Sequence, residues 1–246
     1  MIDEDEECAS TASELFALLE KSWTHIARHL TVSYSQRRKK LLLQDFESKL
    51  RAIEQNVQGH ATANNSDEAN HWRRADFFVR SIVHELEMWL AIHEDKAPAA
   101  WTAFCSAEGY AMRAAGWLPD CSLAQERVRH LAEVERVVFP NQPWFISSGL
   151  IVSKETCTLC GSEYGTCGHV AGEIYNGTVA WRRGEEIKEV LEVSFVKDPS
   201  DKNCRITGVN GGIDPLTGEP SPAIKGKTQL TPKGRRRKSR WKRRKR

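Results

Sequence analysis

Cys157-Thr158-Leu159-Cys160-Gly161, followed after a short loop by Cys167-Gly168-His169, is the stretch around which this chain is organised. Zinc binds cysteine sulfur and histidine nitrogen in tetrahedral sites, and a Cys-x-x-Cys turn is a frequent half of such a site. Glycine directly after the second cysteine permits the positive φ angle that the turn needs. The spacing therefore predicts one Zn²⁺ site with four ligands: Cys157, Cys160, Cys167 and His169.

The number of ligands predicts the role of the metal. A catalytic zinc ion keeps one coordination position for water, whereas four protein ligands close the site, so we predict a structural ion. Two alternatives stay open. Cys204 replaces His169 as the fourth ligand if the chain between them folds back, and Cys157 with Cys160 forms a redox pair if the turn opens a helix after a strand.

Composition predicts a soluble, cytoplasmic protein. The chain has 246 residues, of which 40% are hydrophobic, as in ordinary globular proteins. Its first residues, Met1 to Glu7, are acidic where a signal peptide is basic and then apolar, and no apolar stretch has the length of a membrane span. An odd number of cysteines, seven, favours metal ligation in a reducing compartment over disulfides.

Helical periodicity fills residues 10–140, after an acidic leader at 1–9 that we expect to be disordered. Apolar residues recur there at spacings of three and four in five successive segments, which predicts an all-helical domain. Start and stop signals agree with five helices: capping boxes at Thr11 and Ser122, a cap at Ser66 or Asp67, a helix end at Gly59 and Pro98 in a first turn.

Short β-prone runs replace this pattern after Pro140. They predict a small zinc-stapled antiparallel β domain at residues 141–207, and therefore an α+β fold. Asn176-Gly177 predicts a tight hairpin. The run from Val190 to Val196 alternates as a strand, and regular alternation places Leu191, Val193 and Phe195 on one face, with Ser194 on the other.

Residues 208–246 are predicted to be a disordered linker and basic tail, because they contain few large apolar side chains. Residues 233–246 include eleven lysines and arginines, so the net charge of +3 leaves −8 for the rest of the chain. Such a run neutralises phosphates and an aromatic ring within it stacks on bases, which predicts nucleic-acid binding; an acidic protein is the alternative partner. The predicted contacts are Arg235, Arg236, Arg237, Lys238, Arg240, Trp241, Lys242, Arg243 and Arg244.

The segment from Phe139 to Thr207 resembles a family of uncharacterised bacterial and phage-associated zinc-binding proteins. The resemblance is carried by Phe139-Pro140, Trp144 to Gly149, Cys157 to Gly161, Cys167-Gly168-His169, Gly172 to Gly177 and Glu192 to Pro199. It supports the grouping of His169 with the three cysteines, and it implies no settled activity.

The run Glu192 to Val196, followed by Pro199, also resembles the serine-bearing strand of phage prohead proteases. That resemblance implies Ser194 as a nucleophile with a histidine base. The sole histidine in residues 141–207 is His169, which zinc would occupy, and serine without a base is a poor nucleophile. We therefore predict a non-enzymatic zinc-binding interaction protein, with a Ser194 hydrolase, or an inactive relative of one, as the alternative.

Overall fold

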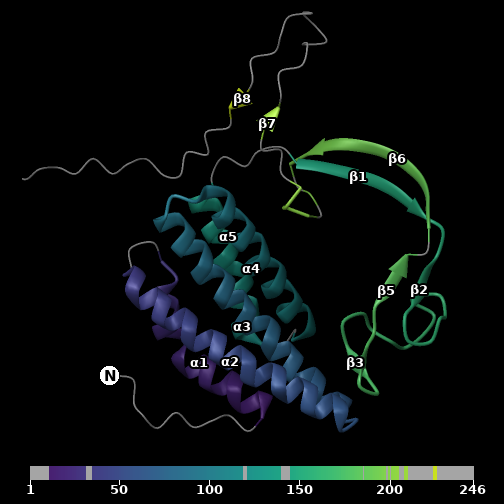
Figure 1. Ribbon diagram of the computed structural model, residues 1–246, viewed down its shortest axis with the longest axis horizontal. Coiled ribbons are helices and arrows are strands. Elements are labelled where there is room, and N and C mark those ends of the chain that lie inside the picture. The colour runs from purple at the N-terminus through teal and green to yellow at the C-terminus, as the bar shows by residue number, and fades with distance from the viewer. Residues whose placement is uncertain are drawn as a thin grey trace, which may run out of the picture.

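A computed structural model (Figure 1) describes residues 11–31, 35–118, 121–139, 145–184, 186–197, 199, 201–204, 208–209 and 224–225. The described residues confirm the α+β fold class, with five helices followed by antiparallel β structure. The predicted leader at 1–9 and most of the predicted linker and tail lie outside the described residues. Among the described residues, no helix is both long and apolar enough to cross a membrane.

The helices are α1 (Ala12–His29), α2 (Gln36–Thr62), α3 (Ser66–His93), α4 (Ala97–Trp117) and α5 (Ser122–Val138). Helix α3 is central, because it packs along both α2 and α4 and also contacts α1. More than half of its residues are buried. Helix α5 packs on α4 and also contacts α3, where Arg127 of α5 bonds Ser81 and Glu85. The buried apolar side chains form two clusters. The first joins α1, α2 and most of α3 with the end of α4 and the start of α5, and the second joins the end of α3 with the rest of α4 and α5.

Two predicted signals at helix starts are confirmed. The Glu14 backbone N–H donates to Thr11 Oγ1, and the Thr11 N–H donates to the Glu14 carboxylate, both at 3.2 Å, so the capping box forms. Pro98 lies in the first turn of α4. Both signals are local. The capping box satisfies backbone N–H groups within the first turn, and proline suits that turn because its missing N–H would have no partner there.

Three other boundary predictions are wrong. Helix α2 continues past Gly59 to Thr62 and ends before Asn64, which takes the left-handed conformation (φ 58°) that terminates many helices. Asn65 caps α3 in place of Ser66 or Asp67, since its side chain accepts the Glu68 N–H at 3.4 Å. Ser122 is the first residue inside α5, one position too late for its hydroxyl to cap the helix.

The β structure consists of two-stranded antiparallel pairs. Strand β1 (Phe145–Val152) pairs with β6 (Ile187–Val196), β2 (Glu155–Cys157) with β5 (Arg182–Gly184), β3 (Ile174–Tyr175) with β4 (Thr178–Val179), and β7 (Gly208–Val209) with β8 (Ile224–Lys225). The predicted hairpin at Asn176-Gly177 is confirmed: both residues have positive φ, 47° and 75°, as a two-residue type I′ turn requires.

Strand β6 does not alternate regularly, and this corrects the predicted face. Gly149 pairs with Glu192 but Leu150 pairs with Val190, so Leu191 is an extra residue in a β-bulge. A side chain at Gly149 would lie 3.6 Å from Leu191 Cβ and 3.2 Å from Glu192 Cγ, which places both residues on one face. Val190 therefore takes the place of Leu191 beside Val193 and Phe195.

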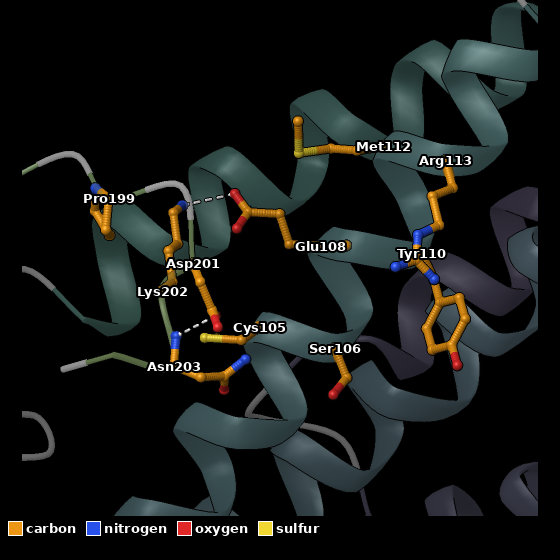
Figure 2. Close-up of a pocket in the computed structure, with 11 residues that line it drawn as sticks. Cys105, Ser106, Glu108, Tyr110, Met112, Arg113, Pro199, Asp201, Lys202 and Asn203 are labelled. Carbon is orange, nitrogen blue, oxygen red and sulfur yellow. Dashed lines mark hydrogen bonds and ion pairs between the residues drawn. The ribbon is translucent and has the colours of Figure 1, made fainter. Parts of the chain in front are cut away.

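The start of the β1–β6 ribbon and residues 201–204 are attached to α4 and α5. Phe145 is buried in the second apolar cluster, where its ring lies 6.1 Å from that of Trp101. The Lys202 ammonium bonds Glu108 of α4 and Glu135 of α5 at 2.7 Å each, and the Lys202 carbonyl accepts the Trp101 indole N–H. Figure 2 shows the Glu108 contact at the edge of an open cavity between α4 and residues 199 and 201–203.

Candidate metal centre

The four predicted ligands come together. The sulfur atoms of Cys157, Cys160 and Cys167 and a ring nitrogen of His169 all lie within 4.8 Å of one another. Cys157 is buried, Cys160 is exposed, and the other two are half-buried. The Cys157 sulfur lies 3.6 Å from His169 Nδ1. Zinc bonds of about 2.3 Å place tetrahedral ligands roughly 3.8 Å apart, so these residues fit one metal ion.

The first half of the cluster is a tight turn at the end of β2. The Gly161 N–H donates to the Cys157 carbonyl, and the Cys157 N–H donates to the Ser162 carbonyl, both at 2.9 Å. Gly161 has φ 70°, as its place after the cysteine pair predicts. No helix begins here, so the context of a redox Cys-x-x-Cys pair is not present at this turn.

Two hydrogen bonds attach this turn to the chain beside β5. The Thr158 N–H donates to the Trp181 carbonyl at 3.0 Å, and the Trp181 N–H donates to Thr158 Oγ1 at 2.8 Å. The turn is thereby fixed relative to the strand that precedes the long β6 strand.

The second half of the cluster is positioned by Tyr175. The ring of His169 lies edge-on against the Tyr175 ring, with centroids 4.8 Å apart. The Tyr175 hydroxyl accepts the Val170 N–H at 3.0 Å and donates to the Glu173 carboxylate at 2.7 Å. A second tyrosine, Tyr164, accepts the Ala171 N–H at 3.1 Å. Tyrosine side chains therefore hold the backbone directly after His169.

The cluster is docked on the helices through the β3–β4 hairpin. Asn70 of α3 donates to the Ile174 carbonyl at 3.0 Å and accepts the Ile174 N–H at 2.7 Å, and the Asn176 N–H donates to Ser66 Oγ at 3.1 Å. The Ile174 side chain is buried against Ala61 and Ala69. This attachment joins the metal-binding loop to α2 and α3.

The close spacing of the thiols changes the pKa values of Cys160 and Cys167. Hydrogen bonds to Ser162, and then to His169 and Cys157, lower the pKa of Cys160 to about 6. The Cys167 pKa changes in the other direction: a backbone hydrogen bond from His169 lowers it, but burial and the neighbouring Cys160 and Cys157 thiols outweigh that effect and raise it. A bound cation favours thiolates at all three positions.

The other predicted site residues lie elsewhere. Cys204 is exposed beside the start of β1, where its carbonyl accepts the Ile146 N–H and its thiol lies 3.7 Å from Asp201, and it is not part of the cluster. Ser194 is half-buried opposite Ser147, and in the part of the chain that the structure describes no hydrogen bond joins it to a histidine. The predicted nucleic-acid contacts from Arg235 to Arg244 lie outside the described residues.

Sequence reasoning missed the residues that support the cluster. Asn70 lies within a helix, and nothing in its local sequence distinguishes it from a surface asparagine. Tyr175 directly precedes the Asn176-Gly177 turn, and that turn was the available signal that the chain reverses close to His169. Their roles depend on contacts between segments far apart in the chain.

Comparison with models of known protein families, with curated proteins and with solved structures gave no match to this chain. The resemblances proposed for residues 139–207 and 192–199 therefore stay predictions.

Proposed function

We propose that this protein is a non-enzymatic zinc-binding interaction protein that binds nucleic acid through residues 233–246. The observation that carries the zinc part is the approach of three cysteine sulfurs and one histidine nitrogen to within 4.8 Å. Soft thiolates with one imidazole in a four-ligand arrangement are typical of structural zinc, which would supply a cross-link and leave no coordination position for a substrate.

The small apolar content of the β structure supports a structural role for the metal. In the described part of residues 145–204 the buried apolar side chains are Phe145, Cys157, Ile174 and Ala180. So few cannot hold the loop between β2 and β5 by apolar burial alone, because small units lack the surface to offset their ordering entropy. In such folds the free energy of metal binding becomes free energy of folding.

Metal content of the purified protein tests this part. We expect close to one zinc per chain by plasma mass spectrometry, with marked loss in Cys157→Ser and His169→Ala. Cys204→Ser is the matched control, since it removes an exposed thiol outside the cluster, and it should keep the metal. Substoichiometric zinc in the unaltered protein, or equal loss in the control, would refute the site.

Charge and one aromatic residue support the nucleic-acid part. Residues 233–246 contain eleven basic residues and no acidic one, with Trp241 among them. Binding of such a segment to phosphates releases counterions, so its affinity falls steeply with salt and depends little on sequence. The rest of the chain has a net charge of −8, which disfavours phosphate binding outside the tail. The charge distribution therefore supports the tail as the binding segment.

Binding of fluorescent single-stranded DNA over a salt series tests this part. Deletion of residues 233–246 should abolish binding, whereas Trp241→Ala should keep the salt slope and cost about 1–3 kcal/mol if the ring stacks on a base. Unchanged retention after the deletion would contradict the proposal. Binding of an acidic protein but not DNA by the same segment would replace it with the alternative partner.

A further inference from the structure

The two-stranded ribbon of β1 and β6 has one apolar face. Residues directly opposite each other in an antiparallel pair share a face, and alternate residues of β1 share it too. The pairs Ile146 with Phe195, Ser148 with Val193, Leu150 with Val190 and Val152 with Ile187 therefore lie on the same side. Seven of these eight residues are large and apolar, and none is ionisable.

This face is exposed to solvent. The seven apolar side chains are between 38% and 70% exposed, with Phe195 the most exposed. The opposite face contains Phe145 and Val196, which pack on the helical core. Its other residues are Ser147, Gly149, Ile151, Glu189, Leu191, Glu192 and Ser194, of which Ile151 and Leu191 are exposed and apolar. Figure 1 shows the ribbon extending away from the helices. The more apolar of the two faces is therefore the one exposed to solvent, whereas in a monomeric protein that face would be expected to pack on the core.

An isolated two-stranded ribbon of this kind is marginally stable in water, and sheets are stabilised when their apolar face is covered. Contiguous apolar patches on soluble proteins mark interaction surfaces. Two register shifts in β6 produce this pattern. Leu191 is the extra residue at the first, so Val190 lies opposite Leu150, and Lys188 is the extra residue at the second, so Ile187 lies opposite Val152. The apolar ribbon face therefore has the properties of a surface that another molecule covers.

The C-terminal part of the chain offers no suitable cover. A covering strand needs large apolar residues at alternate positions, so that one side faces the ribbon. Residues 205–246 contain no two large apolar residues spaced by two. This excludes the predicted linker and tail as an apolar strand against the ribbon.

A second copy of the chain does match the face. The eight paired residues of this face carry no charge, so two copies of it meet without like-charge repulsion between them, and an isologous contact needs only one patch on each copy. A head-to-tail contact would need a second apolar patch. On the described helices the exposed large apolar residues are single: Leu41, Met112 and Val137 on three different helices. Outside the helices and this face they are Val170, Trp181 and the pair Ile151 and Leu191, a smaller set than the seven of the ribbon face.

We infer that the apolar face of the β1–β6 ribbon is a homodimer interface, in which the ribbons of two copies pack face to face about a two-fold axis. Sheets packed in this way lie about 10 Å apart and interdigitate their side chains. The dimer brings two metal-binding loops and two tails into one assembly, and it requires neither nucleic acid nor the tail.

Sedimentation of the full-length protein tests the interface, after nuclease treatment and at high salt so that nucleic acid bridges no chains. Leu150→Glu and Ile151→Glu form a matched pair: the residues are adjacent, 44% and 40% exposed, and lie on opposite faces. We expect a dimer for the unaltered chain and for Ile151→Glu, and a monomer for Leu150→Glu. Val193→Glu, at a position 64% exposed, should also give a monomer with unchanged helical circular dichroism.

Three outcomes would overturn the inference. The first is an unaltered chain that sediments as a monomer at about 100 µM, because a specific dimer associates more tightly than that. The second is continued dimerisation of Leu150→Glu and Val193→Glu, and the third is dissociation of the Ile151→Glu dimer to the same extent as in those two variants. Deletion of residues 233–246 should leave the dimer intact, so this test and that of nucleic-acid binding can fail independently.

Discussion

Asn70 in α3 and Ile174 in β3 exchange two hydrogen bonds, although 104 residues separate them in the sequence. The asparagine side chain satisfies both the N–H and the carbonyl of a buried residue, as a neighbouring strand would. It therefore takes the place of a third strand beside the β3–β4 hairpin. This contact attaches the loop that contains His169 to the helical region.

Asn70→Ala should destabilise the protein by about 1–3 kcal/mol, because it leaves a buried donor and a buried acceptor without partners. Urea unfolding followed by circular dichroism measures the change. Asn56→Ala is the matched control, since Asn56 is half-buried and its amide makes an exposed hydrogen bond to the Ala52 carbonyl in its own helix. Equal unfolding midpoints for the two variants would show that the Asn70 contact contributes nothing.

Gly177→Ala should weaken the docking of the same hairpin. An added Cβ would lie 2.9 Å from the Ala61 carbonyl oxygen of α2, and backbone cannot move aside as a side chain can. Gly165 also has positive φ but has open space around it, so Gly165→Ala reports backbone strain alone, about 1–2 kcal/mol. We expect Gly177→Ala to cost about 1–3 kcal/mol more than Gly165→Ala in unfolding free energy. Equal costs would contradict this contact.

Local sequence codes predicted the parts of the fold that depend on neighbouring residues. The Thr11 capping box, Pro98, the Asn176-Gly177 turn and the grouping of Cys157 with Cys160 each act within a few residues. Gly59 shows the limit of such codes. A glycine is tolerated inside α2, and the nearby Asn64 ended the helix in its place.

Long-range features could not be predicted from one sequence. The bulge at Leu191 arises from the register with Gly149, which no residue in β6 specifies alone. The prediction therefore placed Val193 and Phe195 on one face correctly but exchanged Leu191 with Val190. The contact of Asn70 with Ile174 likewise depends on how α3 meets the hairpin. The alternating pattern predicted a strand but could not predict which of its faces meets the helices.

The buried ion pair of Glu85 and Arg127 should make stability fall in acid. Both side chains are fully buried. The Glu85 carboxylate also accepts a hydrogen bond from the Trp89 indole N–H, and His130 Nε2 lies 2.9 Å from the same carboxylate. Burial alone would raise the Glu85 pKa, but Arg127 and His130 outweigh it and lower the pKa below the ordinary 4.5. The stabilisation is therefore complete above the unfolded pKa and is lost as pH falls through the folded pKa.

Arg127→Met tests the pair, because it leaves the Glu85 carboxylate buried without its cation and should cost about 3–5 kcal/mol at neutral pH. Arg136→Met is the control: Arg136 bonds Glu133 on the surface, with 73% and 67% of the two side chains exposed, and the loss should be at most about 1 kcal/mol. Unfolding free energies measured from pH 7 into acid should show the acid decline for the unaltered chain. Equal costs for the two variants would refute a stabilising role for the buried pair.

Metal removal should unfold the loop locally and leave the helices folded. The Cys157 and Gly161 amides donate within the cluster turn, so hydrogen exchange at both should accelerate after chelation. The Ile174 amide bonds Asn70, and the α3 core is buried by α2 and α4, so both should stay protected. In Asn70→Ala the Ile174 amide should lose protection even with metal bound. Uniform loss of protection across α3 after chelation would mean instead that the metal holds the whole chain together.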